Sequence, residues 1–148
     1  MFAQRGFDVV GLDVTTAMLQ IARSRMAGRC LQADCRCLPF RDAIFGGVWA
    51  SASLLHLAKG QVKVALSEVR RVLRTGGAFY SSVKGGDADG LMVTTRDVRL
   101  PRQFAHYRRE EWTALLGDAG FAVEEFTVDN PDAIPPDTPW LAAYATVR

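Results

Sequence analysis

The sequence is short of lysine and of long apolar runs, and each shortage excludes a class of partner. Only Lys59, Lys63 and Lys84 are lysines among the 18 basic residues of the 148-residue chain, and the arginines are scattered along it. A nucleic-acid-binding face requires clustered basic residues, so we predict that the protein does not bind nucleic acid. No run approaches the ~20 apolar residues that a membrane-spanning helix needs, so we predict no membrane span.

Cysteine is also scarce, with Cys30, Cys35 and Cys37 as its only occurrences. An odd number of cysteines in a sequence with no visible secretory signal predicts reduced thiols and a cytoplasmic location. The three residues lack the paired CxxC spacing of a zinc site, and the sequence offers no convincing fourth ligand beside them. We therefore predict that no metal is bound.

The composition is typical of one ordinary globular domain, which we expect to span residues 1–148. Hydrophobic residues make up 49% of the chain and the net charge is only +2, so the chain is not intrinsically disordered. Short apolar runs alternate with longer amphipathic ones, which is the pattern of a parallel sheet covered by helices.

The pattern predicts a Rossmann-like, doubly wound α/β fold whose mostly parallel sheet ends in an antiparallel C-terminal strand. Strands are expected at residues 7–12, 30–33, 47–51, 78–83, 121–128 and 140–147. Helices are expected between a cap at Thr15 or Thr16 and a stop at Gly28, and over residues 61–74 and 110–119. Residues 85–102 are glycine-rich and polar at first, and predict a mobile loop; the proline-rich residues 130–139 predict a surface loop.

Acidic residues follow the first two expected strands, where ligands bind in doubly wound sheets. Asp13 ends the first strand and could accept hydrogen bonds from ribose hydroxyls. Asp34 holds the same place after the second strand and could accept one from an exocyclic amine. The alternative for Asp13 is a cap of the following helix, and for Asp34 a turn carboxylate. The third strand ends in the small residues Ala50, Ser51 and Ala52, which allow a ligand to approach the backbone closely.

Four segments of the sequence, in this order, resemble one enzyme family. They are GFDVVGLDVTTAMLQIAR (6–23), LQADCRCLPFRDAIFGGVWASASLLHL (31–57), ALSEVRRVLRTGGAFYSSV (65–83) and HYRREEWTALLGDAGFAVEEF (106–126). Together they resemble the class I S-adenosylmethionine-dependent methyltransferases, particularly the small-molecule type that includes the ubiquinone-biosynthesis methyltransferases. The resemblance covers nearly the whole chain. It implies S-adenosylmethionine as cofactor and methyl transfer to a small-molecule acceptor.

The resemblance also implies which residues hold the methyl donor. The implied set comes from three strand ends: Asp13, Val14, Met18, Asp34, Cys35, Ala50 and Ser51. Asp13 matches the acid that binds the ribose hydroxyls, and Val14 and Met18 match the positions that flank the adenine. Asp34 matches the carboxylate that faces the adenine amino group, with the Cys35 backbone amide beside it. The last two residues of the set match the segment under the methionine moiety. For Met18 the alternative is a position in the core of the helix.

Two histidines and a tyrosine are the candidates for catalysis. A general base adds about 10²–10⁴-fold to a rate where the acceptor must lose a proton. The resemblance places His56 near the donor and the substrate. His106 is the second candidate base, and Tyr107 is a candidate hydrogen-bonding partner. The alternative for His106 is a surface residue before a helix.

The main departure from the family is the absence of its glycine-rich loop, since no GxGxG occurs in the sequence. In the family that loop follows a first strand that lies between the strands expected here at Val9 and at Val48. We therefore expect an N-terminally truncated domain with two unpaired strand edges. The edges can be satisfied by direct pairing of these two strands or by a strand from another chain, and we expect direct pairing or a homodimer.

Two alternatives to an active methyltransferase follow from the same residues. A nicotinamide-dependent dehydrogenase also places an acid at a strand end, but it needs the same glycine-rich loop and does not share the RVLRTGG segment. The second is a truncated, non-catalytic methyltransferase-fold remnant that acts as a binding or oligomerisation module. Whether the chain is an enzyme depends on whether it still binds the donor.

Overall fold

The first part of the chain contains a short parallel pair of strands. The computed structural model describes residues 2–23, 29–94, 97–129 and 138–148, with the side chains of residues 91–101 left undescribed. It divides into two compact units, Met1–Pro39 and Phe40–Arg148. The first unit contains a 3-10 turn, two strands and a helix: η1 (Ala3–Arg5), β1 (Gly11–Asp13), α1 (Thr16–Arg23) and β2 (Cys30–Gln32). The single-domain assignment of residues 1–148 stays a prediction.

The pairing of β1 with β2 is parallel and aligns Gly11 with Cys30 and Asp13 with Gln32. The Ala33 amide extends the ladder by donating to the Asp13 carbonyl. The first strand is shorter than the expected 7–12, because its partner β2 offers only three residues to pair with. Helix α1 begins where the threonines predict, and buries Leu19. Its expected end at Gly28 lies outside the described residues.

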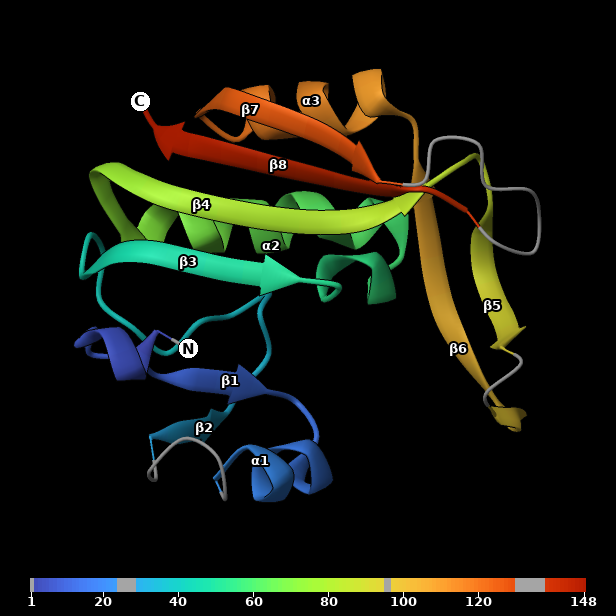
Figure 1. Ribbon diagram of the computed structural model, residues 1–148, viewed down its shortest axis with the longest axis horizontal. Helices are drawn as coiled ribbons and strands as arrows, with labels where there is room; N and C mark the ends of the chain where they lie inside the picture. The colour runs from blue at the N-terminus through green and yellow to red at the C-terminus, as the bar shows by residue number, and fades with distance from the viewer. Residues whose placement is uncertain (1, 24–28, 95–96, 130–137) are drawn as a thin grey trace. The chain divides into compact units, whose positions relative to one another are not determined.

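The second unit is a mixed sheet with two helices (Figure 1). Its elements are β3 (Phe45–Ser51), η2 (Leu54–His56), α2 (Lys59–Val72), β4 (Leu73–Gly85), β5 (Asp89–Thr94), β6 (Asp97–Tyr107), α3 (Arg109–Asp118), β7 (Phe121–Asp129) and β8 (Trp140–Val147). The strand order is β5-β6-β4-β8-β7, with β3 also pairing β4. Strand β4 is parallel to β3 and β6, whereas β8 is antiparallel to both β4 and β7. The α/β fold and its antiparallel C-terminal strand are therefore confirmed.

Helices α2 and α3 lie on the same side of this sheet (Figure 1). The apolar residues that recur at every third or fourth position of α2 are buried against the sheet, as predicted. The core between helices and sheet contains these fully or nearly fully buried residues: Val62, Leu66, Val69, Phe79, Val83, Trp112, Leu116 and Phe121. The other face of the sheet carries Trp49, Tyr80 and Tyr144, of which Trp49 and Tyr144 are 45% and 43% exposed.

One predicted loop is wrong. Residues 85–102 were expected to be a mobile loop, but β5 and β6 form an antiparallel ladder that runs from Asp89 opposite Ala105 to Thr94 opposite Asp97. The glycines and charges at the start of this segment obscure the valines and threonines that follow, which favour strands. Pairing between the two halves of the segment satisfies the backbone groups that a loop would leave to water.

Each of the two strands that were expected to have an unpaired edge has one partner within its own unit. Among the residues described, β1 pairs with β2 and β3 pairs with β4. Val9 precedes β1, and Val48 pairs with Phe79 of β4 on one edge of β3. The expected direct pairing of the strands at Val9 and Val48 would join the two units and stays a prediction. The homodimer stays a prediction. No helix within the described ranges is long and apolar enough to cross a membrane.

Candidate donor site and acceptor pocket

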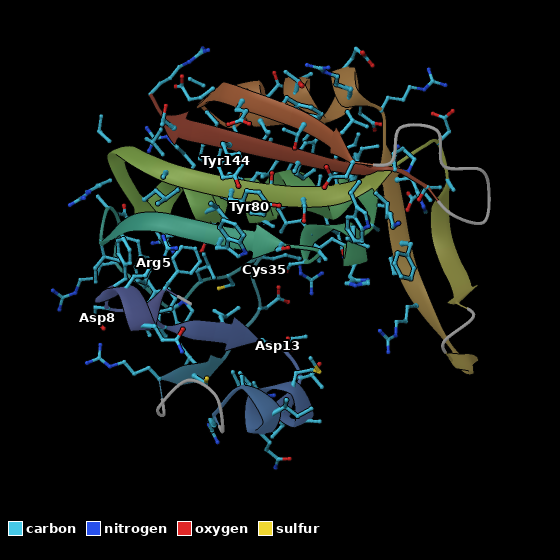
Figure 2. All side chains as sticks on the ribbon, in the orientation of Figure 1. Arg5, Asp8, Asp13, Cys35, Tyr80 and Tyr144 are labelled. Atoms are coloured by element: carbon cyan, nitrogen blue, oxygen red, sulfur yellow. The ribbon has the colours of Figure 1, made fainter. Side chains whose placement is uncertain are left out.

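Asp13 is the last residue of β1 (Figure 2), and its carboxylate is only partly used within the protein. Its Oδ1 accepts a hydrogen bond of 2.7 Å from the Thr15 backbone amide. This contact is an Asx turn that leads the chain from β1 toward α1, which begins at Thr16. Asp13 therefore bonds a turn amide, and its role as a cap of the helix is not shown. No described residue donates to Oδ2, so one carboxylate oxygen is left for a ligand. An oxygen in this position can accept a ribose hydroxyl, so the turn contact and ligand binding at Asp13 are compatible.

The apolar residues expected to flank the adenine are not in the core of the first unit. Val14 is 65% exposed and Met18 is 52% exposed, whereas Leu19 is 2% exposed. The alternative that Met18 is a core residue of the helix is therefore wrong, since Leu19 fills that role. Two exposed apolar side chains beside Asp13 provide the kind of surface on which an adenine ring can lie.

Asp34 lies in the turn after β2 and is held by Arg36. The guanidinium Nε donates to both carboxylate oxygens at 3.0 Å, and a terminal nitrogen donates to Oδ2 at 2.6 Å. The Arg36 backbone amide also donates to Oδ1 at 2.8 Å. These hydrogen bonds lower the pKa of Asp34 to about 2. A carboxylate can accept about four hydrogen bonds, and those from Arg36 already occupy these positions. To accept one from an adenine amino group, Asp34 must lose a hydrogen bond from Arg36.

Cys35 lies between these two residues and is partly buried. Burial of its thiol, together with the nearby Asp34 charge, raises the pKa of Cys35. The thiol is therefore a poor nucleophile in this state. The role expected of its backbone amide stays a prediction.

Ser51 and Ala52, at the end of β3, are fixed by a serine of the neighbouring strand. The Ser82 hydroxyl accepts a hydrogen bond of 3.0 Å from the Ala52 backbone amide and lies 3.3 Å from the Ser51 hydroxyl. Ala52 has a φ of 51°, which is uncommon for a residue other than glycine and costs conformational energy. The turn that the small residues of this segment predict is therefore present and held in place by Ser82.

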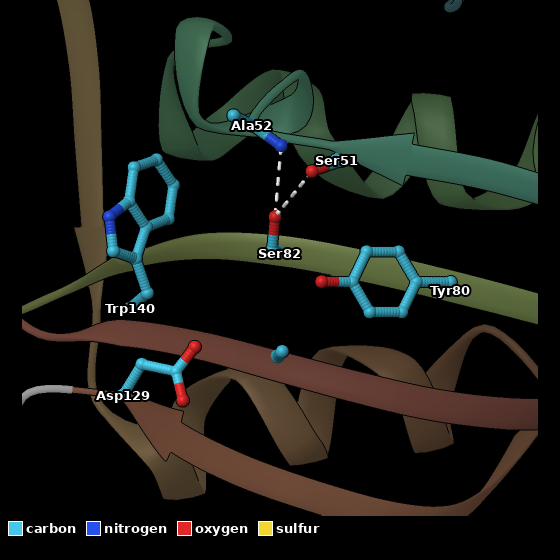
Figure 3. Close-up of a pocket in the computed structure, with 7 residues that line it drawn as sticks. Ser51, Ala52, Tyr80, Ser82, Asp129 and Trp140 are labelled. Carbon is cyan, nitrogen blue, oxygen red and sulfur yellow. Dashed lines mark hydrogen bonds between the residues drawn. The ribbon is translucent and has the colours of Figure 1, made fainter. Parts of the chain in front are cut away.

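A pocket of about 210 Å³ opens at this edge of the sheet (Figure 3). Its lining comes from strands that are far apart in the sequence: Ser51, Ala52, Tyr80, Ser82, Asp129, Trp140 and Ala142. Of the predicted site residues, Ser51 alone is in this lining. The sequence also pointed to Ala52, as a small residue that lets a ligand approach, but not to Tyr80, Ser82 or Asp129. Their proximity depends on the order β4-β8-β7, which no local pattern reveals.

His56 is exposed and does not line the pocket. Its Nδ1 lies 2.9 Å from the Gln103 carbonyl oxygen, and its ring packs edge-on against Phe104 at 4.9 Å. A carbonyl can only accept a hydrogen bond, so Nδ1 is the donor here, and no described residue bonds to Nε2. The chemistry of a general base is therefore present, while the catalytic role of His56 stays a prediction.

His106 and Tyr107 lie inside the second unit, on β6. His106 is 6% exposed and Tyr107 is 0% exposed. The alternative that His106 is a surface residue is therefore wrong. The His106 Nδ1 and the Tyr107 hydroxyl are buried and have no hydrogen-bonding partner among the described residues. Burial lowers the pKa of His106 and raises that of Tyr107. Burial thus favours the neutral form of both groups, and their catalytic roles stay predictions.

The two units together carry the features of a Rossmann-like protein that binds a nucleoside: parallel strands, an acid at the end of β1, and helices packed on a sheet. Residues 1–81 match the family model described as "Methyltransferase domain". The chain belongs to this family, the class I S-adenosylmethionine-dependent methyltransferases. The resemblance stated from the sequence is confirmed.

Comparison with relatives and solved structures agrees with this assignment. The chain is 38% identical over 91 residues to a malonyl-[acyl-carrier protein] O-methyltransferase of Erwinia pyrifoliae, which covers 57% of this chain and 34% of that protein. It therefore spans about a third of the length of that relative.

Two solved structures share the fold. A SAM-dependent methyltransferase from Methanosarcina mazei has a TM-score of 0.83 at 18% identity, covering 99% of this chain and 84% of that one. The 1,6-didemethyltoxoflavin-N1-methyltransferase of Burkholderia thailandensis, solved with 1,6-didemethyltoxoflavin and S-adenosylhomocysteine, has a TM-score of 0.75 at 21% identity. That match covers 99% of this chain and 64% of the solved one. At these identities the likeness supports the Rossmann-like fold alone.

Proposed function

We propose that the chain binds S-adenosylmethionine and takes part in methyl transfer to a small-molecule acceptor. The observation that carries this proposal is the Asp13 carboxylate at the end of β1, with Oδ1 used by the Thr15 amide and Oδ2 left without a partner in the described part of the chain. Family membership supplies the identity of the donor. Val14 and Met18, which follow Asp13 in the sequence, are exposed and offer apolar surface for an adenine ring.

The proposed roles divide between binding and proton transfer. When bound, S-adenosylmethionine would supply a methyl group on a positively charged sulfur; an electron pair of the acceptor would bond to the methyl carbon while the carbon–sulfur bond breaks and leaves a neutral thioether. Asp13 accepts hydrogen bonds from the ribose, and Val14 and Met18 contact the adenine. Alignment of acceptor and methyl group can contribute roughly 7–11 kcal/mol to lowering the barrier, so binding and positioning are the main tasks of the protein. The His56 Nε2 takes the proton where the acceptor must lose one.

Asp13→Ala tests the donor site by calorimetric titration with S-adenosylmethionine and S-adenosylhomocysteine. A hydrogen bond to a charged group is worth about 1.5–3 kcal/mol, so the Kd for both should rise about tenfold or more. Asp13→Asn retains an oxygen that can accept from the Thr15 amide and loses the charge, so it separates the turn contact from binding. Asp118→Ala, a change at the exposed end of α3, is the control and should leave the Kd unchanged.

The same titration decides between an enzyme and the non-catalytic remnant. A wild-type chain that binds neither compound, or an Asp13→Ala variant that binds as well as wild type, would contradict the proposed function. The remnant hypothesis predicts the first of these results. Folding of each variant is checked by circular dichroism, so a loss of binding is assigned to the site only where the spectrum is unchanged.

We also propose a cytoplasmic location and a homodimer. Three free cysteines, of which Cys35 and Cys30 are partly buried, support a reducing compartment. The homodimer is supported by the strand edges: in the described residues β3 pairs with β4 alone, which leaves its other edge for a strand of a second copy.

A further inference from the structure

The pocket at the edge of the second unit has the size and shape for one substituted ring. Its volume is about 210 Å³, whereas an apolar cavity of ~150 Å³ holds a benzene molecule. The lining combines the aromatic rings of Tyr80 and Trp140 with the polar groups of Ser51, Ser82 and Asp129. It can therefore contact both a ring and a polar substituent.

Two of the polar groups point into the pocket and are available to a ligand. Figure 3 shows the Tyr80 hydroxyl and the Asp129 carboxylate directed toward its centre, from β4 and from the end of β7. Neither group has a hydrogen-bonding partner among the residues that the structure describes. The Ser82 hydroxyl differs, because it is already engaged by the Ala52 amide and lies beside the Ser51 hydroxyl.

The position of the Tyr80 hydroxyl is set by an aromatic cluster, defined here as Trp49, Tyr80 and Tyr144. The Trp49 and Tyr80 rings are stacked, with centroids 3.7 Å apart and an angle of 15° between their planes. The Tyr144 ring packs against Tyr80 at 4.7 Å. A side chain held between two rings loses little further freedom when a ligand binds, so this hydroxyl is preorganised.

Asp129 is the one charged side chain in the described lining, and no described cation neutralises it. The nearby Lys84 is used elsewhere: its Nζ donates to the Thr138 carbonyl at 2.9 Å and lies 4.4 Å from the centroid of the Trp140 ring. A carboxylate can only accept hydrogen bonds, so Asp129 favours an ammonium or a hydroxyl and repels another carboxylate.

We propose that this pocket binds the methyl acceptor, and that the acceptor is a ring compound with an amine or hydroxyl group, which donates a hydrogen bond to Asp129. The ring lies against Trp140, and the Tyr80 hydroxyl supplies a second polar contact. The assignment to the acceptor rests on the proposed function, whereas the preference for a donor group over a carboxylate rests on the lining alone.

The test uses three probes that share a phenol ring and differ in their terminal group: tyramine, tyrosol and 4-hydroxyphenylacetate. Binding is followed by NMR through the Trp140 indole N–H, assigned with Trp140→Phe. We expect the affinity for tyramine to exceed that for 4-hydroxyphenylacetate about five- to tenfold at neutral pH, with tyrosol between them. Asp129→Asn should abolish this preference, and Asp118→Asn, at an exposed position of α3, should preserve it.

Two results would overturn the inference: no shift of the Trp140 signal with any probe, or a preference that Asp129→Asn leaves unchanged. S-adenosylhomocysteine is titrated into the same samples and read at the Asp13 and Thr15 amides. A chain that binds S-adenosylhomocysteine but gives either of these two results refutes this inference and leaves the proposed function standing. A chain that binds tyramine through Asp129 but not S-adenosylhomocysteine refutes the proposed function, and with it the assignment to a methyl acceptor.

Discussion

Replacing Trp112 with alanine should lower the free energy of unfolding of the second unit by about 3–5 kcal/mol. The Trp112 side chain is 0% exposed, and its ring packs against Tyr107 with centroids 4.8 Å apart. Its Nε1 donates a buried hydrogen bond of 3.2 Å to the Ser81 hydroxyl on β4. Alanine therefore removes a fully buried contact between α3 and the sheet and leaves a cavity. Urea unfolding followed by circular dichroism measures the change.

Two further variants separate packing from hydrogen bonding at this position. Ser81→Ala leaves the indole N–H buried without an acceptor and should cost about 1–3 kcal/mol. Trp49→Ala removes the same side chain from the exposed face, where it is 45% exposed. It should cost less than Trp112→Ala, because the side chain is already partly in water. The loss includes its stacking on Tyr80, which is worth about 0.5–1.5 kcal/mol. Equal losses for Trp112→Ala and Trp49→Ala would show that α3 is not held to the sheet by Trp112.

Gly77→Ala should destabilise the same unit by about 1–3 kcal/mol, because no space is available for a side chain there. A Cβ at Gly77 would lie 2.7 Å from the Arg74 carbonyl oxygen and 3.1 Å from a methyl group of Leu73. The oxygen belongs to the backbone of the turn between α2 and the body of β4, so it cannot move aside as a flexible side chain would. Urea unfolding detects the loss as a lower midpoint at an unchanged slope.

Gly60→Ala is the matched control for this substitution. Gly60 lies in the first turn of α2, and nothing is within 4 Å of a Cβ built there. Alanine favours a helix over glycine by about 0.5–1 kcal/mol, so Gly60→Ala should stabilise the unit. A Gly77→Ala variant as stable as wild type would mean that the turn relaxes and that glycine is not required.

The elements predicted best from the sequence are those with a long and regular pattern. The last strand was expected at residues 140–147 and is found as Trp140–Val147. Helix α2 was expected from Gln61 and begins two residues earlier, at Lys59. The hairpin of β5 and β6 was missed because its stability comes from pairing between residues up to 16 positions apart, such as Asp89 and Ala105. Composition over a short window carries no signal of that pairing.

The residues of the candidate site also differ in how far the sequence predicts them. Asp13 could be found from the sequence because an acid directly after an apolar run is a local feature of a strand end. The hydrogen bonds from Arg36 to Asp34 could not be predicted from the sequence, since they depend on how the turn after β2 folds back. Asp129 and Tyr80 were missed because only the register of β4, β8 and β7 brings them to one pocket.

The central claim, that the β1–β2 unit holds the nucleoside of the donor, is tested most directly by ¹⁵N NMR with S-adenosylhomocysteine. The account predicts shifts concentrated at the amides of Asp13, Val14 and Thr15 and at those of Asp34 and Cys35. It also predicts that these shifts are lost in Asp13→Ala. Saturable shifts that appear only elsewhere in the chain, with the Thr15 amide unmoved and the binding unaffected by Asp13→Ala, would contradict it.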